Sequence, residues 1–316
     1  MKIAFWDNQL CERGTTVALF DYAYYNQTLL NNQSFIFYEK SNPENNPEVV
    51  SKFSKLFPLF PVNNFSDVDD VLKENGITHL YIIKFGVNDG KISNVAKNCI
   101  HCVFTAEEPH GDVYTTIHRK VYGNHDGKFP VVPHMINLPN VDGNMREELN
   151  IPEDAIVFGG YGGRNNFSIG YVQKLVYEIA SSNSNIYFLF ANFLPFCEKL
   201  PNIIHLPTII DMREKVRFIN TCDAKLWARL DGETFGLAIG EFCLKNKPVI
   251  CTGVNVEDIS HVDILKDKAI WYTGKDDLRE ILLNFNKEEV AKKDWNGYSD
   301  YTPEKVMKIF KETFLD

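Results

Sequence analysis

Short apolar runs alternate with stretches of helical periodicity along the whole chain, a pattern typical of α/β proteins. In the first half, the apolar runs predict strands at residues 2–6, 34–38, 79–84 and 100–105, and another within 130–135. Between them, the pattern predicts a helix that opens at Gly14 with a threonine cap, and helices near 49–57 and 66–74. This alternation favours parallel, doubly wound sheets.

The same alternation resumes after a polar segment, residues 138–152, whose prolines and glycine predict a hinge. Beyond it we expect strands at residues 155–161, 186–191, 224–228, 248–251 and 269–272. Helices are expected at 169–181, 211–220, 235–244, 256–266, 276–285 and 303–314. The pattern therefore predicts one domain over 1–145, a second over 146–300, and a final helical segment over 301–316.

Length and composition narrow the class of protein. A chain of 316 residues is long enough for two domains, each with its own core. The formal net charge of -9 argues against a nucleic-acid partner, because a phosphate backbone calls for a basic face. We find no apolar run of eighteen residues, so no membrane span is predicted, and Met1–Asp7 suits a first strand better than a signal peptide.

The cysteines and acidic residues predict no metal site. The seven cysteines are scattered, which favours free thiols and a cytoplasmic location. Cys99 and Cys102 form an isolated C-x-x-C without the second pair that a zinc site would need. Since the sequence also contains no convincing Asp-x-Asp motif, a donor site that works without metal is expected. The sequence does not indicate an oligomeric state.

The most informative segment of the sequence runs from Asp231 to Cys251. Glu233 and Glu241 lie on either side of a glycine turn that opens a helix, and Lys247 and Pro248 lead into a short apolar strand. Unpaired amides at the start of a helix bind anions, and a carboxylate nearby suits a pair of sugar hydroxyls. The segment predicts a pocket for a sugar, a diphosphate and a ribose. The alternative is an ordinary helix with two solvated glutamates.

This segment resembles the signature of the retaining glycosyltransferases of family 4. That signature reads glutamate, a small residue, Phe-Gly-Leu, three variable residues, glutamate, and later Lys-Pro-Val-Ile. The positions that match it are Glu233, Phe235, Gly236, Leu237, Glu241, Lys247, Pro248, Val249 and Ile250. The resemblance implies a GT-B fold: two doubly wound, Rossmann-like domains with an interdomain cleft, acceptor side first, nucleotide sugar second, and a last helix that crosses back to the first domain.

The resemblance also implies roles for the motif residues. Glu233 would hold hydroxyls of the transferred sugar, and Glu241 would hold the ribose. Backbone groups of Thr234, Phe235, Gly236 and Leu237 would line the donor site and stabilise the leaving diphosphate. The nucleotide-diphosphate sugar is then a substrate, and no cofactor is implied. The acceptor would be a hydroxyl of a glycan or of a small molecule.

A glycine-rich strand end, residues 159–164, is the second candidate phosphate site. Gly163 would let the backbone approach the donor, and Arg164 would supply a positive fork for the diphosphate. In the family, a lysine that also binds phosphate follows this arginine by five residues, but here Ile169 occupies that position and Lys174 lies too far along the helix. The alternative is a tight turn with a surface arginine.

Three loops supply the remaining candidates by resemblance to the family. His110, which follows the strand near 100–105, would contact the donor sugar, or would be a turn histidine without a role. Gly14 would lie beside the diphosphate or the acceptor, or would serve the turn alone. Pro207 and Thr208 would border the nucleobase.

These features together predict a retaining, metal-independent glycosyltransferase that acts on a nucleotide-diphosphate sugar. A GT-B epimerase or an inverting transferase is the alternative within catalysis. A catalytically silent protein that binds sugar nucleotides or glycans is the alternative outside it, and Ile169 is the residue that favours this reading.

Overall fold

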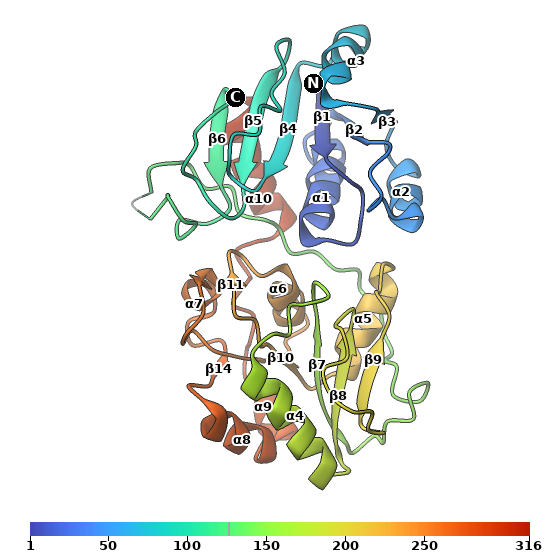
Figure 1. The fold of residues 1–316 in the computed structure, drawn as a ribbon, viewed down its shortest axis with the longest axis vertical. Coiled ribbons are helices and arrows are strands. Elements are labelled where there is room, and N and C mark those ends of the chain that lie inside the picture. Colours follow the sequence, from blue (N-terminus) through green and yellow to red (C-terminus); the bar gives the residue numbers. More distant parts are fainter. Residues whose placement is uncertain (126) are drawn as a thin grey trace. The chain divides into compact units, whose positions relative to one another are not determined.

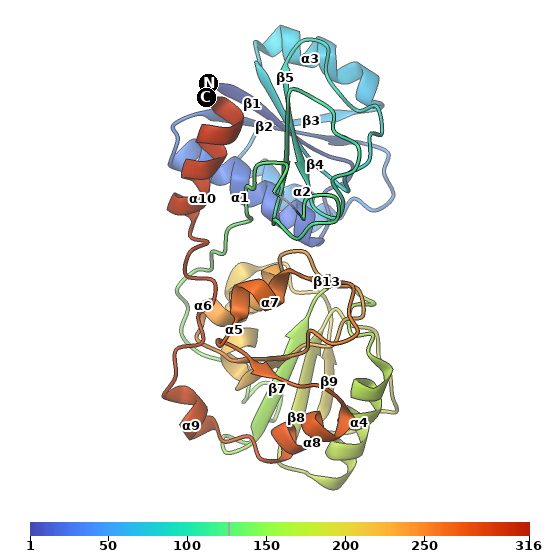
Figure 2. The ribbon, with the colours of Figure 1, turned by 90° about the vertical axis from the view of Figure 1, so that its left-hand side faces the viewer.

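The computed structural model describes residues 1–125 and 127–316, which form two compact α/β units (Figures 1 and 2). The first unit contains Met1–Met135 together with Tyr301–Asp316, and the second contains Ile136–Asp300. Each unit has its own central sheet, and each is described by itself below.

The sheet of the first unit is parallel throughout, in the order β3-β2-β1-β4-β5-β6. This is the Rossmann order, in which the direction of winding reverses between β1 and β4. The strands are β1 Lys2–Asp7, β2 Gln33–Glu39, β3 Leu59–Val62, β4 His79–Lys84, β5 Lys97–Cys102 and β6 Val113–Thr116.

The helices of the first unit are α1 Gly14–Thr28, α2 Pro47–Ser54, α3 Val68–Asn75 after the turn η1 Phe65–Asp67, and α10 Pro303–Phe310, which continues into η2 Lys311–Leu315. Although α10 comes from the end of the chain, it packs beside α1 in this unit (Figures 1 and 2). The Phe310 ring lies 5.2 Å from Tyr22 of α1 and 5.3 Å from Tyr81 of β4, between ring centroids. These buried aromatic contacts fix the last helix to the sheet.

The second unit repeats the same winding. Its six-stranded sheet is parallel and reads β9-β8-β7-β10-β12-β14, so the winding reverses between β7 and β10. A separate two-stranded ribbon pairs β11 with β13. The strands are β7 Ile156–Tyr161, β8 Ile186–Ala191, β9 Ile203–Leu206, β10 Ala224–Leu226, β11 Gly232–Glu233, β12 Val249–Cys251, β13 Asp258–Ile259 and β14 Ile270–Trp271. The helices are α4 Gly170–Ser182, α5 Met212–Thr221, α6 Leu237–Leu244, α7 Ser260–Leu265, α8 Lys275–Leu283 and α9 Lys287–Ala291.

The first boundary between the units lies at residues 135 and 136, and not at 145 and 146 as the sequence pattern suggested. The intervening segment is tied to two helices of the second unit. The Asn220 amide of α5 donates to the carbonyl oxygens of Val141 and Gly143, at 3.1 and 3.0 Å, and the Lys245 ammonium beyond α6 donates to Pro139 O at 3.1 Å. Although this segment is polar and contains proline and glycine, hydrogen bonds from Asn220 and Lys245 therefore hold it in place.

Two further expectations about elements are wrong, and three edge strands were missed. The strand expected within 130–135 is absent; Val131 forms only an isolated bridge with Thr116. The helix expected at 256–266 begins at Ser260, because the residues just before it pair as β13. The edge strands β3, β6 and β9 were not predicted; they are short, and Pro61 lies within β3.

The prediction that a threonine caps the first helix is also wrong. Arg13 occupies the N-cap of α1, and no side chain caps the helix there. The Thr16 hydroxyl instead donates to the Asp7 carboxylate at 2.6 Å. Burial nevertheless raises the pKa of Asp7 to about 6, against the opposing effect of that hydrogen bond.

None of the helices in the described part of the chain is both long and apolar enough to cross a membrane. All seven cysteines are free thiols, and six of them are buried.

Candidate functional site

The winding of the second unit reverses between β7 and β10, and the loops that follow these two strands hold the main candidates. Ligands of open α/β sheets bind where such a reversal opens a crevice at the carboxyl ends of the strands. The loop after β7 carries Gly163 and Arg164, and the loop after β10 leads through Arg229 to Glu233. The sequence motifs therefore meet at one end of one sheet.

The loop after β7 forms a tight turn in which Asn166 N donates to Gly163 O at 2.9 Å. A Cβ atom on Gly163 would lie 3.1 Å from Asn166 Oδ1, so the turn leaves little room for a side chain. Arg164 is exposed, and the structure shows no hydrogen bond or ion pair from its side chain to any residue that it describes. Its guanidinium is available for an anion.

Asn192, which the sequence analysis missed, joins this loop to the one after β9. Its amide donates to Gly162 O at 2.8 Å and accepts from the Thr208 hydroxyl at 2.6 Å. Asn192 has a positive φ of 63° directly after the buried strand β8, a conformation that asparagine tolerates better than most residues. The two predicted donor loops, 162–164 and 207–208, therefore lie side by side.

Glu233 lies in β11 and is held by two neighbours. The indole Nε1 of Trp227 donates to Glu233 Oε1 at 3.0 Å, and Arg229 donates to Oε2 at 3.3 Å. The Glu233 side chain keeps 18% of its surface exposed. It is thus an oriented carboxylate that a ligand hydroxyl can still reach.

The turn after Glu233 places helix α6. Gly236 occupies the N-cap position with φ 86°, a left-handed conformation that is strained for other residues. Thr234 and Phe235 are buried, Leu237 is partly exposed, and the Tyr298 hydroxyl fixes the turn by donating to Phe235 O at 2.5 Å. No acidic residue lies in the first turn of α6, so the positive end of the helix is not neutralised from within.

Glu241 is buried in α6 and bound by protein donors on both oxygens. Lys215 Nζ of α5 donates to Oε1 at 3.0 Å, and the Tyr161 hydroxyl at the end of β7 donates to Oε2. The Glu241 side chain keeps only 6% of its surface exposed. Glu241, the residue predicted to bind the ribose, therefore also forms an internal ion pair with Lys215, which the sequence did not indicate.

A buried lysine lies beneath this ion pair. Lys225 of β10 points its ammonium group to Tyr161 O at 3.4 Å and over the rings of Tyr161 and Phe242, 5.1 and 5.0 Å from their centroids. Burial lowers the pKa of Lys225 to about 8, while the carboxylates of Glu233 and Glu241 oppose that shift. A positive charge thus lies within the sheet and interacts with the carboxylates of Glu233 and Glu241.

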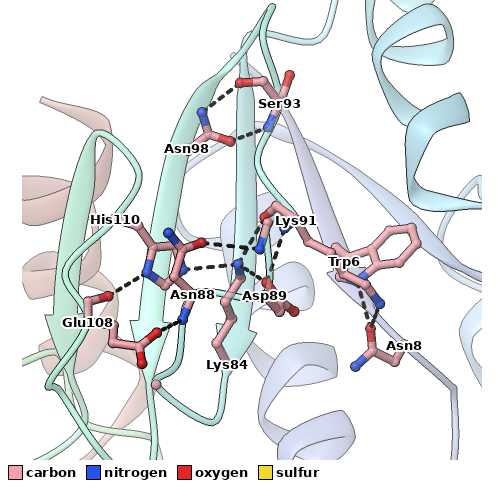
Figure 3. A network of polar contacts seen from close by, with 12 residues as sticks. Trp6, Asn8, Lys84, Asn88, Asp89, Lys91, Ser93, Asn98, Glu108 and His110 are labelled. Atoms are coloured by element: carbon pink, nitrogen blue, oxygen red, sulfur yellow. Dashed lines mark hydrogen bonds and ion pairs between the residues drawn. The ribbon is translucent and has the colours of Figure 1, made fainter.

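Two predicted residues, Gly14 and His110, belong to the first unit. Gly14 is the first residue of α1. The half-buried His110 belongs to a polar network that Figure 3 shows at close range: Lys84 Nζ donates to His110 Nε2 at 3.0 Å, and the other ring nitrogen donates to Glu108 O at 2.6 Å. Lys84 also pairs with Asp89 at 2.5 Å. Both ring nitrogens of His110 are therefore engaged within the unit.

Among residues 1–125 and 127–316, no group of three or more histidine, cysteine, aspartate or glutamate side chains is placed to hold a metal ion.

The chain matches no protein-family model, and no curated protein sequence matches it. Solved structures do match. HepE of Anabaena in complex with UDP and glucose has a TM-score of 0.71 at 12% identity, over 99% of each chain. The fold is GT-B.

Two more structures agree with this fold. A glycosyltransferase from Rickettsia africae has a TM-score of 0.66 at 12% identity, over 100% of this chain and 99% of its own. The lipopolysaccharide outer core galactosyltransferase WaaB has a TM-score of 0.60 at 13% identity, over 99% of each chain. At such low identity the likeness shows the fold, and function has to be argued from the site.

Proposed function

We propose that this protein is a glycosyltransferase that moves a sugar from a nucleotide-diphosphate donor to a hydroxyl acceptor. One observation carries the proposal: an exposed cation that pairs with no residue in the described part of the chain, Arg164, and an oriented, reachable carboxylate, Glu233, lie on the two loops that flank the reversal of the second sheet. The backbone amides of Ser168 and Ile169 donate to Ala228 O at 2.7 and 3.1 Å, which joins these loops directly.

The chemistry of glycosyl transfer fits these groups. As the bond between sugar and diphosphate breaks, the sugar becomes positively charged and the leaving diphosphate gains negative charge. Arg164 and the first amides of α6 stabilise the diphosphate in this proposal, Glu233 orients hydroxyls of the sugar, and Glu241 accepts from the ribose. Thr208 and Pro207 border the base. A phosphate oxygen of the donor takes the proton from the acceptor, so no protein base is required.

Finer features are part of the same proposal. Retention of anomeric configuration follows from the resemblance of residues 233–250 to family 4, and turnover without metal follows from the assignment of the leaving diphosphate to Arg164 and the first amides of α6. HepE was crystallised with UDP-glucose, UDP and glucose, so UDP-hexoses are the first donors to test. We place the protein in the cytoplasm because its seven cysteines are free thiols, as is usual in a reducing compartment.

A panel of sugar nucleotides tests the proposal. UDP-, GDP- and ADP-sugars are compared by thermal shift, because a ligand that binds the native state raises the melting temperature. One nucleotide class should bind, and Arg164→Ala should weaken it about tenfold or more, since a charged hydrogen bond is lost. The control is Arg279→Ala, because Arg279 pairs with Glu178 on the surface of α4 and should leave affinity unchanged. No binding by any sugar nucleotide would contradict the proposal.

Turnover with the donor that binds then separates the alternatives. Release of nucleoside diphosphate, unaffected by EDTA and giving the retained anomer by NMR, is the result we expect. A silent binding protein, which the buried Ile169 and the occupied Glu241 favour, would bind the donor without releasing diphosphate. An epimerase would convert the sugar nucleotide into its isomer, and an inverting transferase would give the opposite anomer.

A further inference from the structure

Helix α4 begins beside the candidate site and has no basic side chain at its N-cap. Ile169 occupies its N-cap, and its side chain is buried, 4% exposed. The backbone before the helix is bonded to the loop after β10: Ser168 and Ile169 both donate to Ala228 O, and Leu230 N donates to the Ser168 hydroxyl at 3.0 Å. These bonds fix the backbone at residues 228 and 230, on both sides of residue 229. The residue held against the start of α4 is therefore Arg229.

The Arg229 guanidinium is only loosely paired. It lies 3.3 Å from Glu233 Oε2 and 3.2 Å from Asp231 Oδ2, whereas strong pairs of this kind approach about 2.7–2.9 Å. The Arg229 side chain is 19% exposed, and Asp231, its outer partner, is 64% exposed. Because a guanidinium has five N–H donors, Arg229 can keep Glu233 and exchange the solvated Asp231 for another anion.

The surrounding loops are acidic. Burial raises the pKa of Asp258, and the carboxylates of Glu257, Glu233 and Asp231 add to the rise, while Arg229 opposes it. A diphosphate that approached these carboxylates without Arg229 would meet net repulsion. Arg229 is therefore the group that makes the loop after β10 acceptable to an anion.

We propose that Arg229 binds the diphosphate of the donor together with Arg164, each arginine reaching from one of the two loops that flank the reversal of the sheet. The proposal rests on the proposed function, since it assigns a second cation to the same site. Arg229 then has two tasks: it neutralises the diphosphate and, through its bond to Glu233, sets that carboxylate against the sugar next to the diphosphate. The cation is supplied by the loop after β10 in place of position 169.

The test compares UDP with uridine by calorimetry, or GDP or ADP with its nucleoside if the panel selects that base. Arg229→Met should weaken the diphosphate about tenfold or more, because charge-assisted bonds are lost, and leave the nucleoside unchanged. Arg229→Lys should recover part of the loss, since it restores the charge without the fork. Arg279→Met is the matched control, because Arg279 of α8 pairs with Glu178 of α4 in the same unit. Unfolding curves establish that each variant folds.

The Glu233→Gln background distinguishes contact from charge balance. If Arg229 meets the diphosphate, Arg229→Met weakens binding in this background too. If the loss disappears there, Arg229 only balances Glu233 and the proposal is wrong; equal diphosphate affinity of Arg229→Met and the wild type overturns it as well. Failure of the wild type to bind any nucleoside diphosphate would instead remove the proposed function itself.

Discussion

Glu241 carries the clearest conflict between a predicted ligand role and an observed structural one. Its carboxylate accepts from Lys215 and Tyr161, and yet each carboxylate oxygen has a further lone pair for a ribose hydroxyl. We predict that Glu241→Ala weakens both the donor and the free nucleoside diphosphate, by roughly 1.5–3 kcal/mol for the lost charged hydrogen bonds. Titration calorimetry measures the loss.

A comparison with 2′,3′-dideoxy-UDP, or the same analogue of the selected nucleotide, shows whether the ribose is the partner. The wild type should prefer the nucleotide that has both hydroxyls, and Glu241→Ala should lose that preference. A variant that still discriminates between the two nucleotides would show that Glu241 serves the ion pair with Lys215 alone.

Which site residues the sequence could identify depends on how local their signals are. Glu233, Gly236 and Glu241 lie within nine residues, and Arg164 follows a glycine run, so a single stretch reveals each of them. Lys215 and Asn192 act through partners far along the chain, and Arg229, whose own partners are nearby, is placed by backbone bonds from Ser168 and Ile169 to Ala228. Their pairing depends on which loops the sheet order brings together, and no local pattern encodes that order.

At the scale of elements, the buried central strands were predictable, and the edge strands other than β14 were not. Strands β4 and β8 match the expected 79–84 and 186–191 to the residue, because strands covered on both faces are written as continuous apolar runs. Edge strands such as β3 and β9 are half exposed and short, so their apolar signal is weak. Gly159 in β7 is constrained by a residue far along the chain, Cys222.

The contact between β7 and the end of α5 allows a stability prediction. A Cβ atom on Gly159 would lie 2.2 Å from the sulfur of the buried Cys222, which is closer than atoms can pack. Gly159→Ala should therefore destabilise the protein by about 1–3 kcal/mol, the usual effect of overpacking. Urea unfolding measures the change.

Removal of the obstructing sulfur is the matched control for this prediction. Gly159→Ala combined with Cys222→Ala should regain part of the stability lost in Gly159→Ala, since the methyl group then fills space that the thiol left. If the double variant loses the sum of the two single effects, the contact with Cys222 is not the cause.

At the scale of the whole molecule, the alternation of strands and helices was sufficient to predict two doubly wound domains, and the structure confirms them. The first boundary was misplaced because residues 136–145 look like a linker in sequence and owe their place to bonds from α5 and α6. Buried polar side chains also determine how the stability of the whole molecule changes at low pH.

Acid should destabilise the first unit through two neighbouring buried histidines. His101 and His134 have ring centroids 5.4 Å apart; burial holds the pKa of His101 well below its usual range and lowers the pKa of His134 to about 3. Both stay neutral in the native state, while the unfolded chain takes up protons below about pH 6.5. The two histidines should therefore not affect the free energy of unfolding above that pH. Below it, each should lower this free energy by about 1.4 kcal/mol per pH unit.

Urea unfolding between pH 7.5 and pH 5 measures how steeply the free energy of unfolding falls with acid. The variant His134→Gln shows how much of that slope His134 contributes. The variant removes one titrating group, so its stability should fall less steeply with acid than that of the wild type. Equal slopes for the two proteins would show that His134 does not contribute.

The role of Glu233 in turnover tests the central claim most directly. With the sugar nucleotide that binds, release of nucleoside diphosphate is followed for the wild type and for Glu233→Gln, with water and added sugars as acceptors. Because Glu233 should act mainly on the charged transition state, we predict that kcat falls about 100-fold or more while affinity for the free nucleoside diphosphate does not fall. Equal kcat values for the two proteins, or no release by the wild type with a donor that binds, would contradict the account.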